Sequence, residues 1–212
     1  ELIRVGIFNK SEKITALLPF SISNGILFNT NDSNIELANK QLEYISLEVL
    51  SKMNSDLVNF QIFDIGIKTH FGLLNRLKLS NINIINDATK ISEILEKLFQ
   101  TARHINTNFL TGNIKTLSEF NDIEEFKEPY NVLVIPNFPN HFSQTDLQIL
   151  SDIIEEASNC GIYTIIANND QFLPEETRFN EKYFELTEAI KNKMVTIDVS
   201  DEKPALKNLN IP

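Results

Sequence analysis

Three polar side chains that could carry chemistry follow apolar runs of the chain, where strands are expected to end: Asp64, His141 and Asn168. Ligands of α/β proteins bind beyond the carboxyl ends of parallel strands, so these residues are predicted to border a pocket. The Asp64 carboxylate could act as an acid, a base or a Mg²⁺ ligand. The alternative, which we favour, is that Asp64 caps the turn that contains Gly66.

Histidine and cysteine give no sign of a metal centre. His70, His104 and His141 are too widely spaced for any two to share a helix face, so no metal site is predicted. Cys160 precedes Gly161 at the end of an expected helix. Reactive thiols usually lie at a helix N-terminus or beside a base, so we expect this side chain to pack rather than to react.

Two further groups of side chains are candidates for the surface. An acidic group is expected to form a solvated face: Asp122, Glu124, Glu125 and Glu128. Three phenylalanines lie on or near expected loops and could form a partner surface: Phe138, Phe142 and Phe172.

Composition limits the classes of protein that fit. The chain has 212 residues, a formal charge of −10 and 42% hydrophobic residues, which suits one folded domain. A DNA or RNA binder needs a cationic surface, so the acidity argues against autonomous nucleic-acid binding. Glycine occurs only 6 times, whereas average usage of about 7% would give about fifteen. No glycine-rich phosphate loop is apparent.

The ends and the apolar runs suggest a cytoplasmic fragment. No basic segment followed by an apolar stretch opens the chain, so no signal peptide is predicted. No apolar run approaches the roughly 20 residues of a membrane span. The chain begins at Glu1 rather than Met. We therefore expect residues 1–212 to be a single domain taken from a larger multidomain protein.

Short apolar runs alternate with amphipathic stretches, which is typical of βαβ units around a mainly parallel sheet. Strands are predicted at residues 25–28, 57–65, 82–85, 132–135, 162–167 and 194–199. Runs such as 132–135 lack polar alternation, as expected for strands buried on both faces. The predicted fold is an α/β three-layer sandwich of about five or six strands with helices on both faces.

Helices are expected between these strands. The first begins near Ser33, with Glu36 completing a capping box. The same pattern, Ser143 with Asp146, opens a later helix. Further helices are predicted at residues 71–77, 91–105, 117–128 and 183–193. The tail, residues 201–212, is expected to be irregular.

The order of these segments resembles the RecA-like motor domain of the FtsK/SpoIIIE/HerA DNA translocases. Leu18-Pro19 precedes the first strand, as a Leu-Pro pair does in that family. The stretch 128–139, from Glu-Pro-Tyr to Phe138-Pro139, is similar to the family's Walker B region, and Cys160-Gly161-Ile162-Tyr163 to the start of its next strand. The resemblance spans about residues 14 to 170.

The resemblance places the phosphate loop on eight residues: Asn29, Thr30, Asn31, Asp32, Ser33, Asn34, Ile35 and Glu36. A working loop reads G-x-x-x-x-G-K-[ST], with amides and a lysine around the phosphates and a hydroxyl on Mg²⁺. Here asparagine stands at both glycine positions, Ile35 at the lysine and Glu36 at the hydroxyl.

The Walker B positions have changed as well. Pro136 stands where the Mg²⁺-binding Asp is expected, and Asn137 where the catalytic Glu is expected. The resemblance therefore implies a catalytically inactive domain that binds neither ATP nor Mg²⁺. Its implied partner is an active ATPase domain of the same polypeptide or another copy of itself. DNA would be contacted only indirectly, and no membrane contact is expected.

Two other hypotheses remain open. The domain could bind a nucleotide or another anion at a non-standard site that uses Thr30, Ser33 and Asp64. It could instead be an unrelated α/β interaction module whose likeness to translocases is only topological, in which case its strand order should differ from the RecA-like order.

Overall fold

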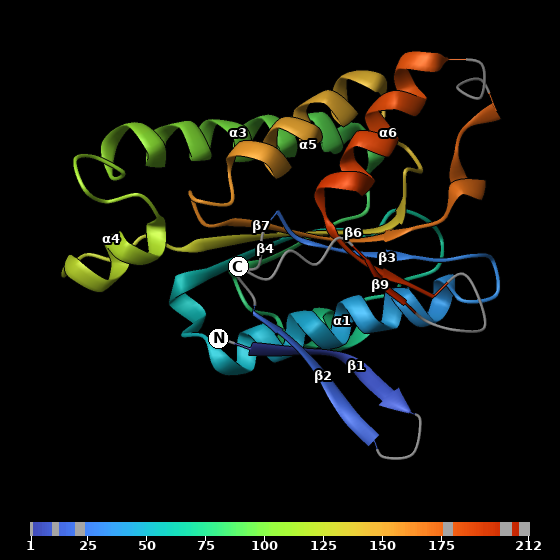
Figure 1. Ribbon diagram of the computed structural model, residues 1–212, viewed down its shortest axis with the longest axis horizontal. Coiled ribbons are helices and arrows are strands. Elements are labelled where there is room, and N and C mark those ends of the chain that lie inside the picture. The colour runs from blue at the N-terminus through green and yellow to red at the C-terminus, as the bar shows by residue number, and fades with distance from the viewer. Residues whose placement is uncertain (1, 10–12, 20–23, 176–179, 200–204, 208–212) are drawn as a thin grey trace.

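A computed structural model of the chain describes residues 2–9, 13–19, 24–175, 180–199 and 205–207. Its centre is a seven-stranded sheet with the order β5-β4-β6-β7-β3-β8-β9, flanked by helices on both faces (Figure 1). Six strands are parallel, and β9 pairs antiparallel with β8. The three-layer α/β fold is therefore confirmed, with one strand more than predicted.

The elements follow one another as strand and helix for most of the chain. The strands of the main sheet are β3 Ile26–Asn29, β4 Val58–Phe63, β5 Ile82–Ile85, β6 Tyr130–Phe138, β7 Ile162–Asn168, β8 Val195–Asp198 and β9 Ala205–Lys207. The helices are α1 Ile35–Lys52, α2 Gly72–Leu77, α3 Ile91–Asn108, α4 Leu117–Ile123, α5 Gln144–Glu156 and α6 Glu181–Lys193. Short 3₁₀ helices are η1 Ser55–Leu57, η2 Ala88–Lys90 and η3 Asp170–Phe172.

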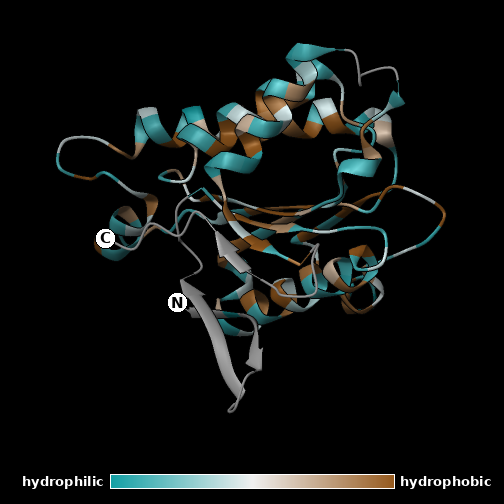
Figure 2. Ribbon diagram, turned by 45° about the vertical axis from the view of Figure 1, so that its right-hand side comes forward, coloured by the Kyte–Doolittle hydropathy of each residue, from teal (hydrophilic) through white to brown (hydrophobic). Residues whose placement is uncertain are grey.

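The core lies on both sides of the central strands. On β6, Val132 and Val134 pack toward α1, and Leu133 and Ile135 pack toward α3 and α5. All four side chains are fully buried. Figure 2 shows the apolar positions of the helices turned toward the sheet. Burial on two faces explains why β6 and β7 appear in the sequence as continuous apolar runs.

A separate hairpin, β1 Leu2–Asn9 and β2 Lys13–Pro19, lies on the outer side of α1 (Figure 1). The Arg4 backbone N–H donates to Glu48 Oε2 on α1 at 2.9 Å. These strands were not predicted from the sequence. Leu18-Pro19 lies at the end of β2, shortly before β3, where the resemblance places it.

Three predicted boundaries are wrong. The helix expected over 117–128 ends at Ile123, because Asn121 Nδ2 donates to Glu128 O and Asn121 Oδ1 accepts from Glu128 N, both at 2.9 Å, which folds the chain back. The tail contains β9, since pairing with β8 supplies its backbone partners. The rest of the tail lies outside the described residues.

The third wrong boundary is the start of α1. The helix begins at Ile35 with Asn34 as its N-cap, and that cap makes no side-chain hydrogen bond. The Ser33–Glu36 capping box does not form, because the Ser33 N–H donates to Asn31 Oδ1 at 2.9 Å. The second capping box, Ser143 with Asp146 on α5, is confirmed.

Candidate functional site

Asparagine side chains join the carboxyl ends of β3 and β7. Asn29 on β3 is in register with Asn168 on β7 and with Asp198 on β8. Asn168 Nδ2 donates to Asn29 Oδ1 at 2.9 Å and to Asp170 Oδ1 at 3.0 Å, and Asn29 Nδ2 approaches Asp198 Oδ1 at 3.5 Å. The Nδ2 groups of Asn29 and Asn168 thus have acceptors, whereas the buried Asn168 Oδ1 accepts no hydrogen bond from a described residue. The network joins the strand ends at the edge where a RecA-like domain would open to its nucleotide.

The loop between β3 and α1 uses its own backbone donors. Asn34 and Ile35 N–H both donate to Asn31 O at 3.0 Å, and Ser33 N–H donates to the Asn31 side chain. Thr30 donates twice to Asn168 O, from its N–H at 2.9 Å and from Oγ1 at 2.7 Å. A phosphate loop instead aims such N–H groups at its anion. Four backbone N–H groups and one hydroxyl of this loop are therefore committed to the protein.

Carboxylates surround the same loop. Asp32 Oδ1 accepts from Asn169 Nδ2 at 2.8 Å, which fixes an anion above the loop. The exposed Glu36 pairs with Lys68 at 2.6 Å, and that hydrogen bond lowers the pKa of the Glu36 carboxyl. Two carboxyl groups at this loop disfavour the approach of a triphosphate.

A cation also lies at this edge and is paired. Lys191 on α6 lies 3.0 Å from Asp170 and 2.6 Å from Glu188. Burial works against the charge of Lys191, but hydrogen bonds to Glu188 and Asp170 raise its pKa overall. The Lys191 ammonium is therefore held by two carboxylates.

The Walker B positions lie at a break in the sheet. Pairing of β6 with β7 shifts between Ile135 and Phe138, around the buried Pro136 and the partly buried Asn137. Proline has no N–H to donate to a neighbouring strand, which accounts for the interruption. Asn137 adopts a left-handed backbone with φ of 55°.

A hydrogen bond between two side-chain amides joins this break to α1. Asn39 Nδ2 donates to Asn137 Oδ1 at 2.8 Å, so the residue at the expected catalytic Glu position is bonded directly to α1. Neither Pro136 nor Asn137 offers a carboxylate. In the described part of the chain, no group of three His, Cys, Asp or Glu side chains is arranged to hold a metal ion.

Asp64 follows β4 and is buried. Its carboxylate accepts from His70 N–H at 3.0 and 3.2 Å, from His70 Nδ1 at 2.9 Å and from Phe71 N–H at 3.5 Å. These contacts hold the 64–71 loop, in which Gly66 has φ of 137°. These hydrogen bonds agree with the interpretation of Asp64 as a cap of the loop that contains Gly66, with His70 and Phe71 as the capped donors.

The other candidates do not converge on a site. His141 is exposed in the turn after β6, with φ of 68°, and His104 packs edge-on against Phe109 at 5.5 Å. Cys160 is buried, and burial raises the pKa of its thiol, as expected for a packing residue. The predicted aromatic partner surface is wrong: Phe138 and Phe142 are buried and stack edge-on at 5.4 Å, and Phe172 is half-buried.

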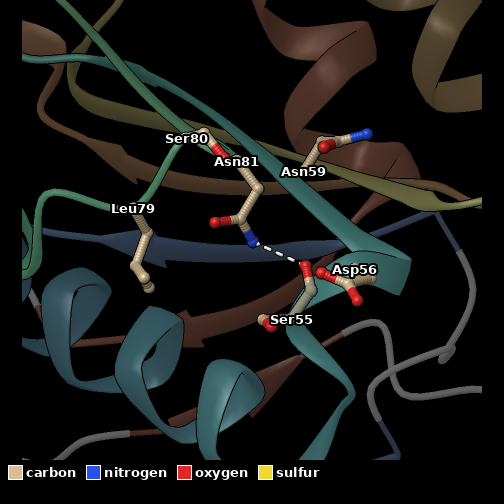
Figure 3. A pocket seen from close by; sticks show the side chains of 6 residues that line it. All are labelled: Ser55, Asp56, Asn59, Leu79, Ser80 and Asn81. Carbon is tan, nitrogen blue, oxygen red and sulfur yellow. Dashed lines mark hydrogen bonds between the residues drawn. The ribbon is translucent and has the colours of Figure 1, made fainter.

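A hollow occurs at the opposite end of the sheet. It measures about 360 Å³ and lies beside the amino ends of β4 and β5, where Asn81 Nδ2 donates to Ser55 O at 2.8 Å (Figure 3). Its lining residues are Ser55, Asp56, Asn59, Leu79, Ser80 and Asn81. Ligands of parallel sheets bind at the carboxyl ends instead, so this hollow is not a nucleotide site of the family type.

No protein-family model and no curated protein matches the sequence. Solved structures do match the fold. EssC (ATPases 2 and 3) from Geobacillus thermodenitrificans aligns with a TM-score of 0.66 and 15% identity, over 93% of this chain and 36% of that chain. The cytoplasmic domain of the Thermomonospora curvata type VII secretion ATPase EccC gives 0.67 and 14%, over 95% and 22%. The pCW3 conjugation coupling protein TcpA gives 0.64 and 17%, over 93% and 53%.

The chain has the RecA-like α/β fold of the ATPase domains in EssC and EccC. At these identities the similarity establishes the fold alone. The chain spans about a fifth to a half of the length of those solved chains. The EssC chain contains two ATPase domains, and the EccC chain is the cytoplasmic domain of a secretion ATPase. No helix in the described ranges is both long and apolar enough to cross a bilayer.

The sequence predicted that the site lies at the carboxyl edge of the sheet, but not which hydrogen bonds close it. The sequence places Asn31 in the loop without indicating that it closes the loop, and it gives no role to Asn39, which ties α1 to β6. The available signal was the abundance of asparagine at strand ends, since asparagine both donates and accepts and tolerates left-handed backbone.

Proposed function

We infer that this chain is a catalytically inactive FtsK/SpoIIIE-like ATPase domain with a structural or regulatory role in a larger protein. The observation that carries the inference is the closure of the β3–α1 loop on Asn31 and Asn168. A nucleotide would have to break these hydrogen bonds before its phosphates could meet the loop N–H groups, and breaking a buried bond such as that of Thr30 Oγ1 costs about 1 kcal/mol or more.

The charges of the loop support the same conclusion. A working site brings a lysine and Mg²⁺ to the β- and γ-phosphates. Here the corresponding side chains are Ile35, which is buried, and Glu36, which is anionic. Asp32 adds a second carboxylate, held by Asn169. Binding of a triphosphate would therefore be opposed by repulsion as well as by lost hydrogen bonds.

Hydrolysis would need a second set of groups that this chain lacks. The Walker B carboxylates hold Mg²⁺ and position the attacking water. Pro136 and Asn137 offer neither charge nor a base, and the Asn137 amide is occupied by Asn39. We expect neither ATP nor Mg²⁺ as a cofactor of this domain.

A domain without its own catalysis can still act within an assembly. The similar structures include an EssC fragment with two ATPase domains, which is the precedent for a neighbouring active domain in the same polypeptide. Another copy of this chain is the alternative partner. We place the domain in the cytoplasm, as the EssC and EccC cytoplasmic parts are, and the charge of −10 leaves DNA contact to the partner.

Titration with a fluorescent ATP analogue in the presence of Mg²⁺ tests the inference. We expect no saturable binding at micromolar analogue and no phosphate release from ATP. Saturable binding that is abolished by Thr30→Ala or Ser33→Ala, but not by Asn113→Ala in a distant exposed loop, would contradict it and favour the anion-binding alternative.

A further inference from the structure

The end of α4 presents a surface that we call the α4 knob. Ile123 and Phe126 are 68% and 65% exposed there. The exposed acidic side chains around them are Asp122, Glu124 and Glu125. Exposed aromatic side chains beside charged residues are a composition that protein-binding surfaces favour.

Hydrogen bonds hold the α4 knob in shape. Asn121 pairs with both backbone groups of Glu128 at 2.9 Å, and Lys127 Nζ donates to Asn121 O. The turn that carries Phe126 is thereby closed on α4. A side chain presented on a fixed turn loses little conformational entropy when it binds, which favours a docking role.

A surface of the opposite character surrounds α2, and we call it the α2 groove. Residues 65–86 contain no Asp or Glu, in a chain with 29 of them. Arg76 and Lys78 are exposed and have no ion-pair partner among the described residues. Leu73 and Leu77 are 44% and 47% exposed beside them.

A hollow of about 380 Å³ runs between α2 and the edge strand β5. Its lining residues are Leu74, Asn75, Lys78, Leu79, Ile82, Asn83 and Ile84. Leu79, Ile82 and Ile84 give the hollow an apolar wall, and Lys78 places a cation at it. The α2 groove is thus an open hollow with apolar, amide and cationic side chains, whose charge is complementary to a side chain flanked by carboxylates.

The two surfaces cannot meet within one molecule. Leu117 and Phe120 of α4 pack in the core on the α3–α5 side of the sheet, whereas Phe71 and Leu74 beside and within α2 pack in the core on the α1 side. Figure 1 shows α4 at one end of the molecule, away from the α1 layer. Two copies of the chain can bring the surfaces together.

We propose that the α4 knob of one copy docks into the α2 groove of a second copy, with Phe126 in the hollow and Glu124 and Glu125 facing Arg76 and Lys78. Because the contact joins two different patches, it leaves one knob and one groove free and repeats head to tail. The contact lies away from the β3–α1 loop, so its failure would leave the proposal of an inactive nucleotide site intact, and the reverse also holds.

Sedimentation velocity on the whole chain measures the contact. The expected result is a sedimentation coefficient that rises with protein concentration and falls as salt is added, because the charge pairs are screened. Phe126→Ser should weaken association about tenfold or more. Phe184→Ser is the matched control, since Phe184 on α6 is also exposed, at 53%, but lies outside both surfaces.

Charge exchange identifies the pairing. Arg76→Glu with Lys78→Glu should abolish association, as should Glu124→Lys with Glu125→Lys. Mixing these two double variants in equal amounts should restore association with the two chains alternating head to tail, because the groove of each variant then carries charges opposite to those of the other variant's knob. A monomeric wild-type chain at all concentrations, association equally lost in Phe184→Ser, or no recovery in the mixture would each overturn the proposal.

Discussion

The loop after β3 and the surface around α2 both carry many polar side chains, and they differ in where those groups find partners. At the loop, the side chain of Asn29 accepts a hydrogen bond from Asn168 on β7, and Asn31 accepts hydrogen bonds from the loop backbone. Around α2, Arg76 and Lys78 face solvent beside exposed leucines. Internal pairing stabilises the fold and leaves little for a ligand, whereas unpaired charge next to apolar surface favours a partner.

The largest expected effect comes from placing a charge in the asparagine network. Asn168 is fully buried and lies beside Asp170 and, through Asn29, near Asp198. Asn168→Asp keeps the shape but adds a buried carboxylate among others, so we expect a loss of about 3–5 kcal/mol in the free energy of unfolding at neutral pH. Urea unfolding measures it.

The pH dependence of that variant checks the cause. Burial and neighbouring carboxylates raise the pKa of the new acid in the folded state above its unfolded value, so the loss is greatest at neutral pH. As pH falls and the acid is protonated, the variant should approach the wild type. Asn113→Asp in an exposed loop is the control, and an equal, pH-independent loss there would contradict the explanation.

A smaller loss is expected at Asp64, which holds a loop at the same edge. Asp64→Ala leaves the N–H groups of His70 and Phe71 without their acceptor, which should cost about 3 kcal/mol. Asp56→Ala, at the exposed hollow beside β4, should change stability by no more than about 0.5 kcal/mol. Thermal unfolding of both variants compares the carboxyl and amino ends of β4. Similar losses of stability in the two variants would contradict a special role for the Asp64 hydrogen bonds.

The sequence predicted the parts of the fold that depend on apolar pattern. The runs in β6 and β7 are continuous because both faces are buried, and no local contact competes with them. Prediction failed where side-chain amides compete with the backbone. Asn31 takes the Ser33 N–H and prevents a capping box, and Asn121 ends α4 early.

The sequence predicted which phosphate-binding residues are missing from the loop, but not which hydrogen bonds close the loop in their place. Missing glycines and lysine could be counted at Asn29, Asn34 and Ile35. The closure by Asn168 depends on a register between β3 and β7, which are separated by more than a hundred residues. Such pairings follow from the three-dimensional sheet, which a single sequence does not encode locally.

An intermediate effect is expected at Asn137, the residue in the catalytic Glu position. Asn137→Ala removes the acceptor for Asn39 Nδ2, which is buried, and places alanine at φ of 55°. The lost bond and the left-handed backbone should each cost about 1 kcal/mol, or about 2 kcal/mol together. Chemical unfolding measures the loss, and an unchanged midpoint would show that the Asn39–Asn137 bond contributes nothing.

The smallest effects come from glycine at two left-handed positions. Lys78, the C-cap of α2, has φ of 53°, close to the 55° of Asn137. Glycine relieves this backbone in both places by up to about 1 kcal/mol. At Lys78 no hydrogen bond to a described residue is known to be lost, so Lys78→Gly should stabilise the monomer by about 0.5–1 kcal/mol. At Asn137 the lost bond from Asn39 offsets the gain, so Asn137→Gly should be nearly neutral. The free energies of unfolding of the two glycine variants, measured at low protein concentration, test this difference. Equal stabilisation by both would mean that side-chain pairing does not distinguish the two regions.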